Sequence, residues 1–172
     1  MTIYSKDGDR GFTSTPNNRK ISKSDPIIEI YGTLDELNVA LGTALAFSQS
    51  EKSKKLLSEL QKQIFEISAH VEDKTPLIAE VDIKRMENDI MIMEERLQVM
   101  QHFIIPGGTK GSCFIHQARI LARELERRFS NIKAPSIYLA YFNRLSDLLF
   151  VLARWENKEE GIEEEIWKEW EE

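Results

Sequence analysis

Three arginines of one predicted helix have a spacing that lets their side chains act together on an anion. Arg119, Arg123 and Arg127 stand at positions i, i+4 and i+8, so a helix places them on one face. Like charges at this spacing destabilise an isolated helix by roughly a few tenths of a kcal/mol for each pair. We therefore expect anionic partners for them. Two kinds of partner are open: carboxylates of the protein on a solvated helix face, and phosphates of a ligand.

A polar stretch near the N-terminus contains residue types that bind phosphate. Gly8 and Gly11 permit a close approach of the backbone. Lys6, Thr13 and Ser14 supply one charge and two hydroxyls beside free backbone amides. The stretch is not a Walker A loop, because no Gly-Lys-Ser/Thr sequence opens a helix there. The other interpretation is an ordinary polar arm.

Polar residues also interrupt an apolar helical pattern nearer the C-terminus, at Asn143, Arg144, Ser146 and Asp147. A buried polar group without a partner costs about 1–3 kcal/mol, so these side chains either tie helices together or face a ligand. Asp35, in the first long helix, is a candidate partner for one of the arginines. The alternative for Asp35 is an ordinary polar helix face.

The histidines and the single cysteine lack the spacing of a metal site. His70, His102 and His116 do not pair with one another or with Cys113 at ligand spacing. No Glu-x-x-His pair of the ferritin-like di-iron type is present. The sequence therefore predicts no transition-metal site built by the protein itself. A single cysteine also excludes a disulfide within the chain.

The bulk composition is that of an acidic globular protein. The 172 residues are 41% hydrophobic and 30% charged, with a formal net charge of −6 and a pI of about 5.3. Nucleic-acid-binding surfaces usually carry a basic excess, so we expect a small anionic ligand and no nucleic acid. No apolar run approaches the roughly 20 residues that span a bilayer, and the N-terminus lacks the apolar core of a signal peptide. We expect a cytoplasmic protein with no membrane partner.

Five helical segments must position these residues. Asp25-Pro26, Ser50 and Ala134-Pro135 are typical helix starts. Apolar residues at helical spacing extend the segments over about 25–49, 51–73, 82–100, 110–130 and 134–157. No stretch alternates convincingly with the period of two that marks a strand. We therefore predict an all-α, five-helix up-and-down bundle, ferritin-like in general architecture. The last segment is apolar on most of its circumference, which predicts a central helix or one at a subunit interface.

The chain outside the bundle falls into two parts. Residues 1–24 are predicted to be irregular, as a loop or an arm. Residues 158–172 form an acidic tail, which we expect to be a short helix or frayed. With the bundle at 25–157, the whole chain is predicted to be a single domain.

Taken together, these segments resemble the PduO-type ATP:cob(I)alamin adenosyltransferases. The family's opening motif corresponds to YSKDGDRGFTS at 4–14, and its first helix to YGTLDELN at 31–38. FIIPGG at 103–108, the helix with His116 and the arginines, and FNRLSDLLF at 142–150 follow in the family's order and spacing. The resemblance covers the chain up to about Asn157.

The resemblance implies a homotrimer with active sites between subunits. It implies transfer of the 5′-deoxyadenosyl group of ATP to the cobalt of cob(I)alamin, with triphosphate as the leaving group and Mg²⁺ carried by the nucleotide. ATP would be bound by residues of the N-terminal loop and of the last two helices: Ser5, Lys6, Asp7, Gly8, Thr13, Ser14, Lys23, Arg123, Glu126, Arg127 and Asn143.

The resemblance also implies roles on the corrinoid side. Asp35 would pair with Arg123 across the subunit interface, and Phe103 would keep the lower axial base off cobalt. His116, Arg119 and Asp147 would support the site or face the corrinoid. A cobalamin reductase and an adenosylcobalamin-dependent mutase are the partners that such an enzyme implies. The alternative functions are a nucleotide- or corrinoid-binding regulator or carrier without turnover, and a purely structural bundle.

Two positions depart from the family pattern. Asp7 stands where the family has a threonine, and Glu124 stands where the family commonly has an arginine. Each change puts a negative charge near the expected phosphates. We therefore expect a difference in ATP affinity or in its magnesium dependence.

Overall fold

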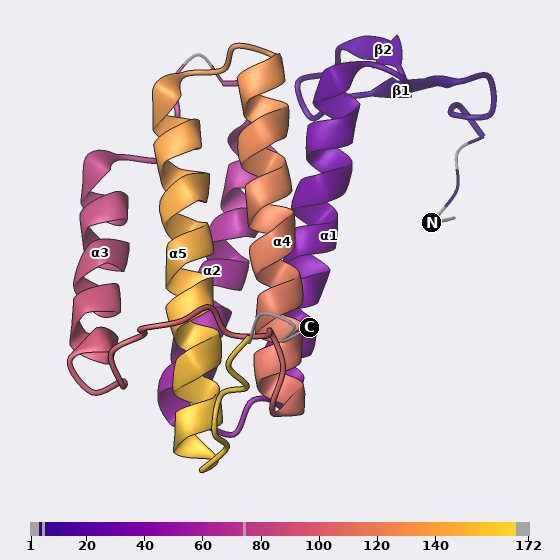
Figure 1. The fold of residues 1–172 in the computed structure, drawn as a ribbon. Coiled ribbons are helices and arrows are strands. Elements are labelled where there is room, and N and C mark those ends of the chain that lie inside the picture. Colours follow the sequence, from indigo (N-terminus) through magenta and orange to yellow (C-terminus); the bar gives the residue numbers. More distant parts are fainter. Residues whose placement is uncertain (1–3, 5, 74, 168–172) are drawn as a thin grey trace, which may run out of the picture.

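The computed structural model describes residues 4, 6–73 and 75–167 of the chain. Its elements are two short strands followed by five helices: β1 (Phe12–Ser14), β2 (Lys20–Ser22), α1 (Pro26–Phe47), α2 (Glu51–His70), α3 (Glu80–Glu94), α4 (Lys110–Asn131) and α5 (Ser136–Glu159). The helices form the predicted bundle, with α4 and α5 side by side and α3 at one edge (Figure 1). The predicted fold class is confirmed.

Three helices begin at residues whose side chains satisfy free backbone amides. The Asp25 carboxylate accepts from the amide of Ile27 at 3.0 Å, with Pro26 at the first helical position. Ser50 caps α2, and the Thr109 hydroxyl accepts from the amide of Ser112 at 3.0 Å at the start of α4. Each such cap contributes about 1 kcal/mol to stability. The predicted helix starts at Asp25-Pro26 and Ser50 are therefore confirmed.

The core is centred on α5, as its apolar circumference predicts. Tyr141, Phe142, Leu145, Leu149 and Leu152 are fully buried there, in one hydrophobic core that also includes side chains of α1, α2, α3 and α4. Burying a side chain of this size contributes about 1.5–3 kcal/mol. The position of α5 therefore fixes where the polar side chains along its outer face lie.

The prediction of no strands is wrong for the N-terminal arm. β1 and β2 pair antiparallel, with Thr13 opposite Ile21. Each strand has only three residues, which is too short to show an alternating pattern in the sequence. Residues 12–22 of the N-terminal arm thus form a small hairpin that lies beside the start of α1 (Figure 1).

The helix α3 and the tail also differ from the prediction. Helix α3 runs over Glu80–Glu94 instead of 82–100. The chain turns at its end, and the carbonyl of Gln98, in the segment after the helix, accepts from the buried Arg154 of α5. The described part of the tail is extended, and Ile166 forms a β-bridge with Ile104. None of the described helices is long and apolar enough to cross a membrane.

Candidate functional site

Many of the predicted site residues lie along one face that α4 and α5 build together. Side chains at intervals of three and four residues share a face of a helix. We call this surface the α4–α5 face, with His116, Arg119, Arg123, Glu126 and Arg127 from α4 and Asn143, Asp147, Phe150 and Arg154 from α5. Arg127 lies eleven positions after His116, a rise of about 16 Å along α4.

At one end of the α4–α5 face, two predicted ATP ligands meet. The Asn143 side chain donates from Nδ2 to Oε1 of Glu126 at 3.1 Å, which joins α5 to α4. Arg123 and Arg127 are exposed on the same stretch of α4. Within the part of the chain that the structure describes, these two arginines form no ion pair. Their guanidinium groups are therefore open to an external anion.

Further along the face, His116 holds Arg119. Nε of Arg119 donates to Nδ1 of His116 at 3.3 Å, and the Phe150 ring lies 6.0 Å from both the His116 ring centre and the Arg119 guanidinium carbon. Burial, followed by the positive charge of Arg119, lowers the pKa of His116 to about 4. His116 is therefore neutral at pH 7, accepts at Nδ1 and carries its proton on Nε2.

No carboxylate forms an ion pair with Arg119 among the residues that the structure describes. Burial lowers the pKa of Arg119, and the positive charge of Arg123 lowers it further. Such a guanidinium is stabilised when an anion binds beside it. Within the described residues of this single chain, Arg119 and Arg123 form no ion pair, so both are open to an anion from outside the chain.

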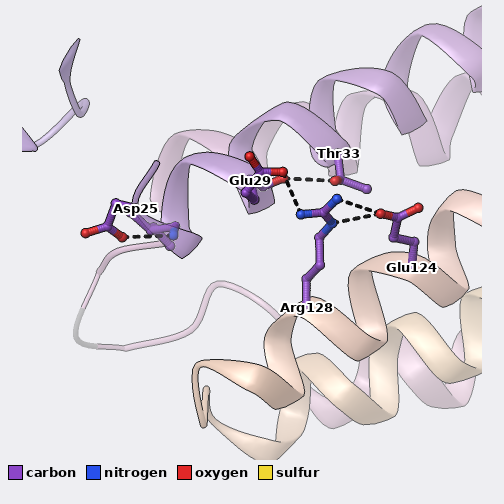
Figure 2. Close-up of polar contacts among 6 residues, drawn as sticks. Asp25, Glu29, Thr33, Glu124 and Arg128 are labelled. Carbon is purple, nitrogen blue, oxygen red and sulfur yellow. Dashed lines mark hydrogen bonds and ion pairs between the residues drawn. The ribbon is translucent and has the colours of Figure 1, made fainter. Parts of the chain in front are cut away.

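Arg128 follows Arg127 directly and lies outside the i, i+4, i+8 series. Carboxylates of the protein bind its guanidinium group instead. It donates to Oε1 of Glu124 from Nε at 2.9 Å and from Nη2 at 2.6 Å, and from Nη1 to Glu29 of α1 at 2.8 Å (Figure 2). Hydrogen bonds to Glu124 and Glu29 raise the pKa of Arg128. The carboxylate of Glu124, the unusual residue of this helix, thus holds Arg128 within α4, and the bond from Arg128 to Glu29 ties α4 to α1.

A hollow of about 440 Å³ lies beside this cluster, at the end of α4. It is lined by Glu124, Arg127, Arg128, Ser130 and Asn131. Because both carboxylates of the cluster are engaged by Arg128, Arg127 remains the cation in this hollow that is open to a ligand.

The N-terminal arm is held at the same end of the bundle, on a different side. Arg19 forms an ion pair with Glu72 at 2.7 Å, and the Tyr31 hydroxyl donates to the same carboxylate at 3.1 Å. Burial, followed by the charge of Glu72, raises the pKa of Tyr31. The loop before β1 extends sideways from the bundle (Figure 1).

Within the arm, the predicted phosphate ligands are partly brought together. The ammonium group of Lys23 lies across Gly8, where a Cβ atom would come within 3.0 Å of it. Gly8 therefore permits the contact that a larger residue would obstruct. Lys6, Asp7 and Ser14 are exposed and Thr13 is half-buried, whereas Ser5 lies outside the described residues.

Three other predicted residues lie apart from the arginines. Asp35 is exposed on α1 and forms no ion pair within the described residues of this single chain. The Phe103 side chain is 78% exposed, in the segment between α3 and α4. Asp147 forms an ion pair with Arg144, which also binds Glu87 of α3 at 3.1 Å.

Sequence reasoning missed the ion pair of Arg154 with Glu164, which ends the α4–α5 face. The signal was available in part, because Arg154 is a charge inside the apolar stretch of α5, as Arg144 is. Its partner lies ten residues further along the chain, beyond the helix, where periodicity gives no information. Among the described residues, no three His, Cys, Asp or Glu side chains are grouped so that they could hold a metal ion.

Comparison with known proteins identifies close relatives. A family model described as cobalamin adenosyltransferase matches residues 3–156. The corrinoid adenosyltransferase PduO of Salmonella typhimurium is 36% identical over 170 residues, covering 92% of this chain and 51% of the relative. The corrinoid adenosyltransferase MMAB of Bos taurus is 32% identical over 183 residues, covering 96% of this chain and 76% of the relative. The chain thus spans about half the length of the PduO relatives it matches.

Solved structures agree with this assignment. A phenylalanine-to-alanine variant of a PduO-type ATP:corrinoid adenosyltransferase from Lactobacillus reuteri, complexed with cobalamin and ATP, matches with a TM-score of 0.91 at 26% identity. The match covers 98% of this chain and 100% of that chain. An arginine-to-lysine variant from the same organism, complexed with ATP, matches with a TM-score of 0.89 at 27% identity, over 96% of this chain and 100% of that chain.

Proposed function

Because this chain belongs to the cobalamin adenosyltransferase family, we propose that it transfers the 5′-deoxyadenosyl group of ATP to the cobalt of cob(I)alamin. The observation that carries the proposal is the arrangement of the α4 arginines. Arg119, Arg123 and Arg127 share one face and lack carboxylate partners among the described residues, whereas Arg128 is fully paired. Three such guanidiniums suit the phosphate chain of a nucleotide, which they can bind through paired hydrogen bonds.

The chemistry requires alignment more than acid–base catalysis. Cobalt(I) is the nucleophile: its electron pair forms the bond to C5′ of ATP, the C5′–O bond breaks, and triphosphate leaves with that electron pair. Arg123 and Arg127 would stabilise the negative charge on the leaving group. The protein would otherwise hold the two substrates in line and keep water away from them. We expect Mg²⁺ to arrive with the nucleotide, bound largely by its phosphates.

We assign the nucleotide side to the exposed end of the α4–α5 face and to the N-terminal arm. Asn143 and Glu126, already joined to each other, would bind the nucleoside part, and Arg123 and Arg127 the phosphates. In the arm, the phosphate ligands would be Ser5, Lys6, Gly8, Thr13, Ser14 and Lys23, with Asp7 the departure that weakens or alters binding.

The arm and Asp35 support an active site shared between subunits of a homotrimer. The loop of the arm extends away from its own bundle, and Asp35 is exposed on α1 without a cation beside it in the described part of the chain (Figure 1). We propose that both meet the arginines of a neighbouring subunit, where Asp35 pairs with Arg123.

The corrinoid side is assigned to the other end of the α4–α5 face. Phe103 would occupy the lower face of the corrin and keep the axial base off cobalt. His116 would hold Arg119 in place, and Asp147 would support the same wall through Arg144. A reductase that supplies cob(I)alamin, a mutase that receives the product, and a cytoplasmic location belong to the same proposal.

The test is to remove each phosphate-binding arginine separately. Arg123→Ala and Arg127→Ala are expected to lower the rate of adenosylcobalamin formation by about a hundredfold or more, because each takes a charge from the leaving group. The measurement is the absorbance change when cob(I)alamin is alkylated, with ATP in excess over several turnovers. The control is Arg85→Ala, which removes an exposed arginine paired with Glu59 on a different side of the bundle.

Full activity in both variants would contradict the site assignment. Tight binding of ATP and corrinoid by the unmodified protein, without a second turnover, would instead identify a carrier or regulator.

A further inference from the structure

A buried ion pair outside the proposed machinery connects the end of the bundle to the tail. The Arg154 side chain is 6% exposed, and its guanidinium donates to Glu164 from Nε at 2.7 Å and from Nη2 at 3.0 Å. Nη2 also donates to the carbonyl of Gln98 at 2.9 Å. One buried cation therefore binds α5, the tail and the segment after α3. A buried charge is kept only when it is paired in this way, so its three contacts depend on one another.

The tail that Arg154 holds is paired with the backbone around Phe103. We call residues 160–167 the C-terminal strap. The amide of Ile105 donates to the carbonyl of Glu165 at 2.8 Å, and the amide of Trp167 donates to the carbonyl of Phe103 at 2.8 Å. These bonds flank the bridge between Ile104 and Ile166.

The pairing fixes the direction of the Phe103 side chain. Successive side chains of extended backbone point to opposite sides. Ile104 faces inward and lines a hollow with Ile166, whereas Phe103 is 78% exposed and Ile105 42% exposed. Among the residues that the structure describes, the bonds to Glu165 and Trp167 are the backbone hydrogen bonds that hold Phe103 on its present side.

Apolar packing alone does not fasten the strap. A hollow of about 670 Å³ lies between the strap and the segment after α3, and its lining includes Leu97, Val99 and Ile162. The ion pair of Arg154 with Glu164 therefore adds a fixed point to the two backbone hydrogen bonds between the strap and residues 103–105. The charge of Glu164 also acts on His116, whose pKa it raises against the larger lowering effects of burial and Arg119. A charge on the strap therefore acts on a titratable residue of the α4–α5 face.

We propose that Arg154 and Glu164 are positioning residues for the corrinoid reaction: their ion pair holds the C-terminal strap against residues 103–105 and so sets the direction of Phe103. The proposal rests on the proposed function, in which Phe103 meets the corrin. Neither residue of the pair touches a substrate, so the effect should fall on corrinoid binding and on the coordination state of cobalt. ATP binding, at the far end of the α4–α5 face, should be unaffected.

The first measurement is made on the protein without substrates. In Glu164→Gln, the amides of Ile105 and Trp167 should exchange with solvent about tenfold faster or more, while core amides of α1 keep their protection. The matched control is Glu165→Gln, which removes an exposed charge from the same strap and leaves the buried pair intact. Unchanged exchange at Ile105 and Trp167 in Glu164→Gln would overturn the role of the ion pair in holding the strap.

The second measurement is kinetic and spectroscopic. For Glu164→Gln we expect the KM for the corrinoid to rise roughly tenfold, the KM for ATP to stay within about twofold, and less base-off cob(II)alamin in the presence of ATP. Phe103→Ala should lose the base-off signature more completely. Faster exchange with an unchanged corrinoid KM and an unchanged spectrum would overturn the positioning role.

A conservative variant separates positioning from simple loss of stability. Glu164→Asp keeps the charge at a shorter reach and should recover part of both the exchange protection and the corrinoid KM. If Glu164→Gln fails to fold, the same two readouts on Glu164→Asp decide the question, with wild-type values in both overturning the proposal. Failure of the unmodified protein to make adenosylcobalamin would remove the proposed function, and the exchange experiment would still test the strap.

Discussion

At the scale of single residues, the arginines of α4 differ in what surrounds them. Arg128 lies between two carboxylates, which raise its pKa, whereas Arg119 is half-buried beside another cation, which lowers its pKa. Residues of one type on one helix are thereby divided into a structural arginine and arginines that need an external anion. That division could not be predicted from the spacing alone, because Glu29 of α1 is distant in the sequence.

His116 gives this electrostatic arrangement a measurable pH dependence. Its pKa is about 4 in the folded protein, mainly through burial, against an ordinary value of 6.5. The unfolded chain therefore takes up a proton between pH 6.5 and pH 4 that the folded protein does not. Stability from neutral His116 is complete above about pH 6.5 and is lost as the pH falls, by up to about 3 kcal/mol.

The measurement is urea unfolding at pH 7.5 and at pH 5, for the unmodified protein and for His116→Asn. The asparagine oxygen can accept from Arg119 as Nδ1 does, but it does not titrate. We expect the unmodified protein to lose more stability than His116→Asn over this interval. An equal loss in both proteins would show that His116 is not kept neutral by the fold.

At the scale of elements, the contact of α1 with α4 includes the cluster of Glu29, Glu124 and Arg128 (Figure 2). Its side chains are 29–56% exposed, so solvent screens the ion pairs and each contributes modestly. The pair of Arg128 with Glu124 is the stronger of the two ion pairs in the cluster, because Arg128 donates two hydrogen bonds to one oxygen of Glu124. The cluster lies near the start of α1, in its first turn.

A double-mutant cycle measures this contribution. Glu124→Gln and Arg128→Gln are each expected to lower the free energy of unfolding by about 0.5–1 kcal/mol, with a coupling energy of about 0.5 kcal/mol between them. Urea unfolding of the two single variants and the double variant gives all three values. Additive effects, with no coupling, would mean that the pair of Glu124 with Arg128 within α4 does not contribute to stability.

How far the elements could be predicted from sequence depended on whether their causes were local. The starts of α1 and α2 could be predicted because Asp25 and Ser50 satisfy amides within three residues. The end of α3 could not, because the contact that holds the following segment comes from Arg154, more than fifty residues away. The hairpin of the arm was not predicted for another reason: a strand of three residues is too short to show alternating apolar and polar residues in the sequence. Family motifs predicted most of the candidate site residues, but not the strap, which lies beyond the last motif.

At the scale of the whole molecule, the single chain presents two incomplete surfaces. One carries the arginines of α4 together with the exposed Ile120, 55% accessible to solvent. The other carries Asp35 of α1 together with Val39 one turn later, 63% accessible. An exposed apolar side chain beside an unpaired charge on each surface is what a subunit interface leaves behind when a single chain is viewed alone.

Mixing two inactive variants tests whether these surfaces meet between subunits. Asp35→Ala lacks the proposed partner of Arg123, and Arg127→Ala lacks a phosphate ligand; each homotrimer should be nearly inactive. If Asp35 and Arg127 of one site come from different subunits, random reassembly of an equal mixture restores both residues at about a quarter of the sites. Activity should rise toward about a quarter of the unmodified value.

The readout is adenosylcobalamin formation after the mixture is unfolded and refolded together, with sedimentation confirming particles three times the 20.0 kDa mass of the chain. The control is the same mixture combined without unfolding, which keeps the original trimers and should stay inactive. A refolded mixture that remains as inactive as its parents, while forming trimers, would show that one chain supplies both residues and that the arm and α1 serve their own bundle.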